Sequence, residues 1–137
     1  MDIFTLEILY DISSKAAQVG REMTKLTLED GINIIYPQKV TSDREDDPDD
    51  FKLITFLESK ILIGSYEGEE RTKLKVIPIR DVKNLELDTT RFGASKLIIS
   101  LKGEDIILDS NEDSSQFFRR EYSQKIPEIF NYLYNKI

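Results

Sequence analysis

Apolar and polar residues alternate in short runs through the middle of this chain, and a period of two is typical of half-buried β-strands. The runs are FKLITFL at 51–57, KILIGSY at 60–66, SKLIISL at 95–101 and DIILD at 105–109. Glu58-Ser59 separates the first two runs, and Lys102-Gly103-Glu104 separates the last two. Short polar turns of this kind join antiparallel neighbours, so the pattern predicts two β-hairpins.

A further hairpin is predicted in KLTLEDGINIIY, residues 25–36. Asp30-Gly31 lies there between two stretches of alternating apolar residues, which hold Leu26, Leu28, Ile32 and Ile34. An Asp-Gly pair supplies the positive φ that a tight turn demands. Strands are therefore expected near 25–29 and 32–36.

A proline interrupts the alternation in KVIPIRDVKNLEL, residues 75–87. Pro78 has no N–H to donate to a strand ladder, so the strand before it must end or bend there. Leu85 and Leu87 resume the alternation, and a new strand is expected just past Asp81. A sheet that turns a corner at such a point would curl over its own core, as a small barrel does.

Both ends of the chain carry helical patterns. Near the C-terminus, apolar residues spaced by three or four share one helical face, namely Phe118, Tyr122, Ile126, Ile129, Leu133 and Ile137. Asp109 or Ser110 would cap the start of this helix, and Pro127 would kink it or split it in two. Near the N-terminus we favour a helix through Lys15 to Met23, whereas residues 3–12 fit either a strand or a helix.

The net charge of −7 is concentrated in one acidic loop within residues 41–50. Residues 43–50, DREDDPDD, hold six carboxylates and one arginine, a sum of −5 that leaves −2 for all other residues. Like charges repel one another and favour an extended, solvated loop. An EF-hand frame from Asp43 fails, because Pro48 and Ile54 stand where the glycine and the bidentate glutamate belong. We expect no dedicated metal site and leave weak calcium binding open.

Several kinds of chemistry are excluded by residue type. The chain has no histidine and no cysteine, so histidine-based triads, histidine or thiolate metal sites and disulfides cannot form. Glu67, Glu69 and Glu70 flank Gly68 in a turn, where carboxylates stay hydrated and are poor candidates for catalysis. We therefore expect no enzyme and no cofactor.

The location in the cell is predicted from two observations. No apolar run approaches the ~20 residues of a membrane span. The chain begins MDIFTLEILYD, with an acidic residue at position 2 where a secretory signal would be positively charged. We expect a cytoplasmic protein without a transmembrane segment.

Two groups of residues are candidates for binding. Arg71, Lys73 and Lys75 alternate along one strand face and could hold an anionic headgroup or an acidic partner, although a solvated strand face is the favoured interpretation. Arg91 and Phe92 lie in the turn TTRFGASK, residues 89–96. An aromatic beside a cation on a turn suits partner recognition, with Phe92 folded inward as the equal alternative.

These features together resemble a bacterial pleckstrin-homology-like, or GRAM-like, domain of a small bacterial protein family. They are the consecutive hairpins from about Gly31, the strand running into Ile77-Pro78-Ile79 and on to Asp81-Val82, the Lys-Gly hairpin and the closing amphipathic helix. The resemblance implies an α+β, mainly β, fold with a strongly bent antiparallel sheet or partly open barrel of about seven strands, capped by the C-terminal helix. On this basis the domain is expected at residues 25–137, with residues 1–24 as an N-terminal extension packed on it.

The function predicted on this basis is a non-enzymatic interaction module. It would bind a protein or peptide through a sheet edge or through the groove beside the C-terminal helix. The alternative is an acidic inhibitor or immunity-type protein that neutralises a basic partner through residues 43–50. A lesser alternative is binding of an anionic lipid headgroup through Arg71, Lys73 and Lys75. Nucleic acid is not an expected partner, and a homo-oligomer stays open.

Overall fold

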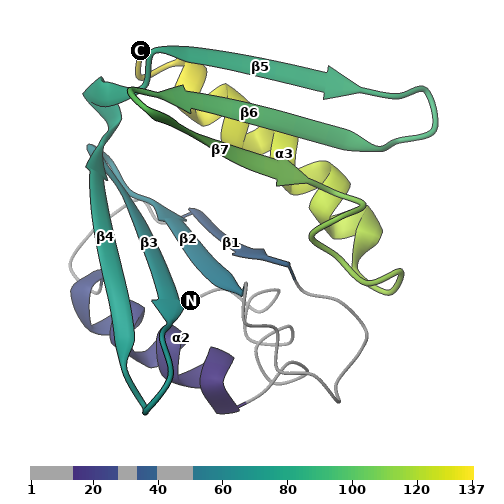
Figure 1. The fold of residues 1–137 in the computed structure, drawn as a ribbon. Coiled ribbons are helices and arrows are strands. Elements are labelled where there is room, and N and C mark those ends of the chain that lie inside the picture. Colours follow the sequence, from purple (N-terminus) through teal and green to yellow (C-terminus); the bar gives the residue numbers. More distant parts are fainter. Residues whose placement is uncertain (1–13, 28–33, 40–50) are drawn as a thin grey trace. The chain divides into compact units, whose positions relative to one another are not determined.

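The computed structural model describes residues 14–27, 34–39 and 51–137. Contacts divide the chain into two compact units, Met1–Ile77 and Pro78–Ile137. Within the described residues, one antiparallel sheet has four strands and the other has three, and two α-helices accompany them (Figure 1). The predicted α+β, mainly β, class is confirmed at this level, and the strands described number seven.

The first unit is built on the four-stranded sheet, whose strand order is β1-β2-β3-β4. The strands are β1 (Ile34–Gln38), β2 (Lys52–Phe56), β3 (Lys60–Tyr66) and β4 (Thr72–Pro78). Antiparallel pairing sets Tyr36 opposite Ile54 and Leu53 opposite Gly64. The predicted hairpin around Glu58-Ser59 is confirmed, and its turn is closed by a 2.8 Å hydrogen bond from the Leu57 N–H to the Lys60 carbonyl.

Helix α2 (Ser14–Thr27) confirms the helix predicted through Lys15 to Met23. Its apolar stripe of Ala16, Val19 and Met23 is buried, and the helix packs on β3. Close approach is allowed by Gly64 on that strand. A Cβ added there would lie 2.9 Å from Val19 Cγ1, well inside van der Waals contact.

The strand predicted near 25–29 is wrong for residues 25–27, where α2 continues. Local helical contacts hold this last turn. The Thr24 hydroxyl donates to the Gly20 carbonyl at 2.7 Å, and Lys25 pairs with Glu22 at 3.0 Å. Leu26 is 57% exposed, so the alternation that suggested a strand does not mark burial. The Asp30-Gly31 turn lies outside the described residues.

The two prolines of the first sheet lie on its edge strands, which is where a residue without an N–H is tolerated. Pro37 lies in β1, and Pro78 is the last residue of β4. The prediction that the strand ends at Pro78 is confirmed. A short 3-10 helix, η1 (Ile79–Asp81), follows it, and β5 (Asn84–Thr89) begins beyond Asp81, also as predicted.

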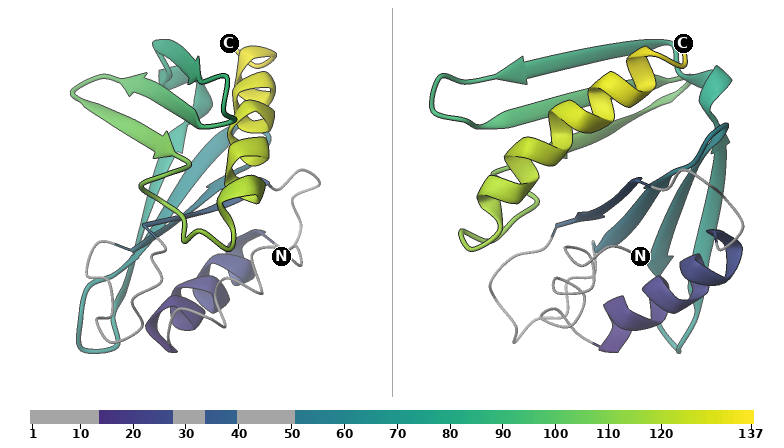
Figure 2. Two further views of the ribbon diagram at one scale, coloured as in Figure 1. Left: turned by 90° about the vertical axis from the view of Figure 1, so that its right-hand side faces the viewer. Right: turned by 180° about the vertical axis from the view of Figure 1, so that it is seen from behind.

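The second unit is a three-stranded meander with a helix on one face (Figure 2). Strand β5 pairs with β6 (Ser95–Leu101), which pairs with β7 (Glu104–Asp109), and the hairpin predicted at Lys102-Gly103-Glu104 is confirmed. Helix α3 (Arg119–Tyr134) contacts all three strands. It buries Tyr122, Ile126, Ile129 and Leu133, four members of the predicted stripe.

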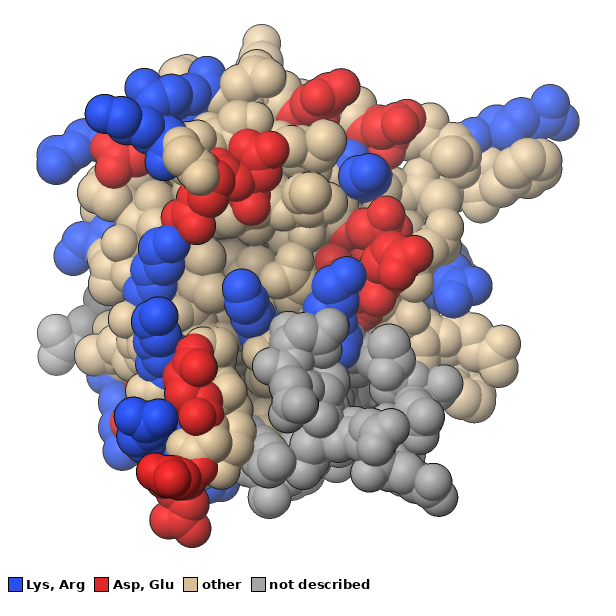
Figure 3. All heavy atoms as spheres, in the orientation of Figure 1, with Lys and Arg blue, Asp and Glu red and all other residues tan. Residues whose placement is uncertain are grey.

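The two faces of the second sheet differ in chemistry. Leu97 on β6 lies opposite Leu87 on β5 and Leu108 on β7, and this row shares the face that α3 covers. Side chains alternate between faces along a strand, so the neighbouring rows place four carboxylates on the opposite face: Glu86, Asp88, Asp105 and Asp109. Figure 3 shows acidic side chains gathered over these strands.

The described strands form two separate sheets and no closed barrel, so the single bent sheet that the sequence predicts is not observed. The partly open barrel stays a prediction. Pro78 ends the first sheet and η1 stands between β4 and β5. The ladder is therefore interrupted where the prediction had it turn a corner. The likeness to a pleckstrin-homology-like domain and the division of the chain at residue 24 stay predictions.

The predicted start of the C-terminal helix is also wrong. Asp109 does accept hydrogen bonds from the backbone N–H groups of Asn111 and Glu112, at 2.8 and 3.2 Å, as a helix cap would. The chain then forms turns, and α3 begins only at Arg119. The Asp113 carboxylate folds back to accept the Asp109 N–H at 2.9 Å, which closes a local turn in place of a first helical turn.

Candidate functional site

The predicted cationic stripe lies on the edge strand of the first unit. Arg71, Lys73 and Lys75 are exposed on and beside β4. Neither Arg71 nor Lys73 has an ion pair to a carboxylate within the part of the chain that the structure describes. Figure 3 shows basic side chains along this strand. Lysine on an edge strand also discourages pairing with another sheet, so exposure alone does not assign a ligand.

The other predicted pair lies at the tip of the β5–β6 hairpin. Phe92 is 88% exposed, so the alternative in which it folds inward is wrong. The Arg91 guanidinium lies over the Phe92 ring, 5.2 Å from its centroid. Three hydrogen bonds between Thr90 and Gly93 or Ala94, of 2.9 to 3.1 Å, hold this turn. The exposed ring is thus presented on a fixed turn.

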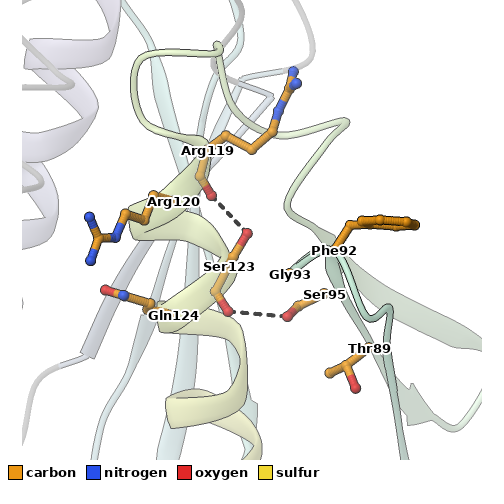
Figure 4. A pocket seen from close by; sticks show the side chains of 8 residues that line it. All are labelled: Thr89, Phe92, Gly93, Ser95, Arg119, Arg120, Ser123 and Gln124. Carbon is orange, nitrogen blue, oxygen red and sulfur yellow. Dashed lines mark hydrogen bonds between the residues drawn. The ribbon is translucent and has the colours of Figure 1, made fainter.

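A pocket of about 490 Å³ lies between this turn and the first turns of α3 (Figure 4). The hairpin contributes Thr89, Phe92, Gly93 and Ser95, and the helix contributes Arg119, Arg120, Ser123 and Gln124. Its volume is within the range of small-ligand pockets. Two arginines and no aspartate or glutamate are among the lining residues, so their net charge is positive although the whole chain is acidic.

These two arginines were not selected from the sequence, although a paired cation beside two aromatics is visible there. Arg119-Arg120 directly follows Phe117-Phe118. With a helix expected from about residue 110, the pair falls in a third turn and reads as a solvated helix surface. The true start at Arg119 places both arginines in the first turn of α3, beside the hairpin tip.

The hairpin and the helix are joined by Ser95. Its hydroxyl donates to the Ser123 carbonyl at 3.1 Å (Figure 4). In a regular helix that carbonyl would accept the N–H of residue 127, but Pro127 has none. Ser95 therefore replaces the missing donor. Helix α3 runs through Pro127 as one helix of 16 residues. Of the two predicted outcomes, a kink or a split into two helices, the split is therefore wrong.

The segment between β7 and α3 is tied to the same serine. The Ser95 N–H donates to Ser110 Oγ, and the Ser110 N–H donates to the Ser95 carbonyl, both at 2.9 Å. The Ser114 hydroxyl donates in turn to the Ser110 carbonyl. The pocket therefore rests on a hydrogen-bonded junction that fixes the hairpin tip relative to α3.

Tyr122 lies in the core of this unit, one residue before Ser123. Burial raises the pKa of its phenol well above the ordinary value, and the nearby Asp113 carboxylate adds to the increase in pKa. The unfolded chain releases this proton near pH 10, whereas the folded protein retains it. The contribution of neutral Tyr122 to the free energy of unfolding is therefore fully present below about pH 10 and is lost as the pH rises above it.

We expect Tyr122→Phe to remove part of the alkaline sensitivity. Between pH 8 and pH 11 the free energy of unfolding of the wild type should fall by up to about 1.4 kcal/mol more than that of the variant. Urea unfolding of both proteins at a series of pH values measures the difference. Tyr134→Phe, at a 65% exposed position, is the control and should keep the wild-type slope. A difference between wild type and Tyr122→Phe that does not change with pH would contradict the assignment.

Metal and membrane chemistry find no support in the described parts of the chain. No group of three or more acidic side chains there could hold a metal ion, and no helix there is long and apolar enough to cross a bilayer. The acidic loop at 43–50 lies outside those residues, so weak calcium binding and the inhibitor alternative stay predictions. A scan of protein-family models, a search of curated proteins and a search of solved structures each returned no match.

Proposed function

We propose that this chain is a non-enzymatic interaction module that binds a segment of a partner protein in the pocket between the β5–β6 turn and α3. The observation that carries the proposal is Phe92, which is 88% exposed at the rim of a 490 Å³ pocket. An aromatic ring held outward on a fixed turn is a suitable anchor for a partner, because little conformational freedom is lost on binding.

The lining residues favour recognition over catalysis. The hydroxyls of Ser95 and Ser123 donate to backbone carbonyls, at 3.1 and 2.9 Å. A nucleophilic serine needs an adjacent base to take its proton, and the side chains that line the pocket include no carboxylate, histidine or lysine. Arginine, glutamine and phenylalanine instead provide hydrogen-bond donors and apolar surface, which are the groups that bind peptides.

The proposal is tested by selecting binders from a random peptide library on the immobilised protein. Amide NMR shifts on titration with a selected peptide should move at 89–95 and 119–124, and Phe92→Ser should weaken binding by about tenfold or more. Phe117→Ser is the matched control, since Phe117 is 78% exposed but does not line the pocket. Equal loss in both variants, or shifts confined to other segments, would remove the proposal.

Anionic headgroup binding by the β4 stripe is the second candidate. It is favoured by the exposure of Arg71, Lys73 and Lys75 along one edge. Co-sedimentation with anionic liposomes at low salt, abolished by Lys73→Glu, would support it. No co-sedimentation would end it.

A further inference from the structure

The two arginines of the pocket approach it from different directions. Successive residues of an α-helix are rotated by about 100° around its axis, so Arg119 and Arg120 cannot point the same way. Figure 4 shows Arg119 extending beyond the end of the helix and Arg120 directed to the side away from Phe92, alongside Gln124. Two guanidiniums so arranged are poorly placed to clamp one small anion together. They suit separate anionic groups at two positions along a ligand.

A third guanidinium extends the positive charge along the hairpin. Arg91 stacks on the Phe92 ring at 5.2 Å, and stacking leaves the N–H edges of a guanidinium available to acceptors. Cationic groups therefore lie on the helix and on the turn, with the apolar ring on the hairpin side. An apolar centre with charged groups around it is a common arrangement in protein interfaces.

We infer that the segment bound by this pocket is acidic, with two or more carboxylates flanking an apolar side chain that packs against Phe92. The inference rests on the proposed function and adds the chemistry of the partner to it. Carboxylates are the natural acceptors for the planar donor fork of arginine. The apolar residue between them accounts for the exposed ring, which a simple anion site would not need.

A long polyanion fits the second unit less well than a short acidic segment. The sheet face opposite α3 carries four carboxylates, Glu86, Asp88, Asp105 and Asp109, against one lysine, Lys96. A nucleic acid that extends past the pocket would meet this repulsion. A segment of a few residues meets only the positive lining.

The test uses two peptide libraries that differ at the positions flanking a fixed leucine. One library carries Asp or Glu there, and the other carries Asn or Gln. We expect selection on the full-length protein to yield binders from the acidic library, with affinities at least about tenfold above the best neutral peptide at low salt. Neutral peptides that bind equally well through Phe92 would overturn the inference while the proposed function stands. Failure of both libraries would count against both.

Variants then locate the charge effect. Arg119→Gln and Arg120→Gln should each weaken binding of a selected acidic peptide by about threefold to fivefold, as expected for partly exposed ion pairs. Arg80→Gln is the matched control. Arg80 is exposed in η1, before β5 and so at the other end of the sheet, and this change should leave affinity within about twofold. All three substituted arginines are exposed, so the variants should fold, and circular dichroism verifies this.

Two competitors separate the remaining sources of negative charge. Inorganic phosphate should displace the peptide no better than chloride at equal ionic strength. Displacement by phosphate at low millimolar concentration would make this a small-anion site and overturn the inference. A single-stranded oligonucleotide that binds more tightly than every acidic peptide would overturn it as well.

Discussion

Replacing Gly64 by valine is expected to lower the free energy of unfolding by about 3 kcal/mol, the upper part of the range for overpacked cores. A Cβ at this position would lie 2.9 Å from Val19 Cγ1, 3.0 Å from Met23 Cε and 3.2 Å from Leu74 Cδ2. Met23 and Leu74 can move the ends of flexible side chains. The β-branched Val19 has little rotamer freedom in a helix, so α2 itself must shift away from β3. Urea unfolding followed by circular dichroism measures the loss.

Steric conflict is separated from other effects of the substitution by a double-mutant cycle. Val19→Ala alone should destabilise, because it leaves a cavity under a fully buried position. In the double variant, Val19→Ala makes room for the Cβ that Gly64→Ala adds. The double variant should therefore be at least about 1 kcal/mol more stable than the sum of the two single-variant effects predicts. Additive effects, or a Gly64→Val protein as stable as the wild type, would show that this contact does not limit the packing of α2.

Ser95→Ala should cost about 2 kcal/mol, because it leaves the Ser123 carbonyl without a donor inside the hairpin–helix junction. The cost should depend on Pro127. In a Pro127→Ala background the helix regains the N–H of residue 127, which can reach the Ser123 carbonyl. There the Ser95→Ala change should cost about 1 kcal/mol less. Equal costs in both backgrounds would mean that Ser95 acts through its other contacts.

The same cycle has a functional readout. Ser95 and Ser123 line the pocket, so removing the hydrogen bond between them should weaken binding of a selected peptide even though Phe92 stays exposed. Ser100→Ala is a suitable control, because Ser100 lies on the same strand with its side chain on the face away from α3. A peptide affinity that is unchanged in Ser95→Ala would show that the junction supports folding without positioning the pocket.

Local patterns were sufficient for the elements whose partners are close in sequence. The hairpins at Glu58-Ser59 and at Lys102-Gly103-Glu104, the end of β4 at Pro78 and the buried face of α3 all follow from residues a few positions apart. These features depend on side-chain period and on the missing N–H of proline, which are properties of the chain itself.

The predictions that went wrong involve competition between local signals and distant partners. Asp109 makes the hydrogen bonds of a helix cap, but Asp113 and the Ser95–Ser110 bonds close a turn there, and α3 starts ten residues later. At Leu26 two local patterns compete, a strand by alternation and a helix by continuity with Met23, and the helix forms, with local contacts of Thr24 and Lys25 holding its last turn. A single bent sheet was expected because the sequence does not indicate whether β4 and β5 continue one ladder.

The candidate site shows the same division. Arg91 and Phe92 could be selected from the sequence because a cation and an aromatic stand beside a glycine in a turn. Arg119 and Arg120, which line the same pocket, lie 27 or more positions further along the chain, and nothing local connects the two pairs. Antiparallel pairing of β6 with β7 brings the end of β7 beside the hairpin tip, and α3 begins from there.

The sequence by itself determined the class of the fold, the positions of most strands, the buried stripe of α3 and the absence of histidine and cysteine chemistry. Only the tertiary structure decided that the strands divide into two sheets, that Ser95 supplies the donor that Pro127 lacks, and that a positively charged pocket forms in an acidic chain. The reason is physical. Periodicity and backbone restriction act over a few residues, whereas ladder continuity, carbonyl satisfaction and local charge depend on which distant segments come into contact.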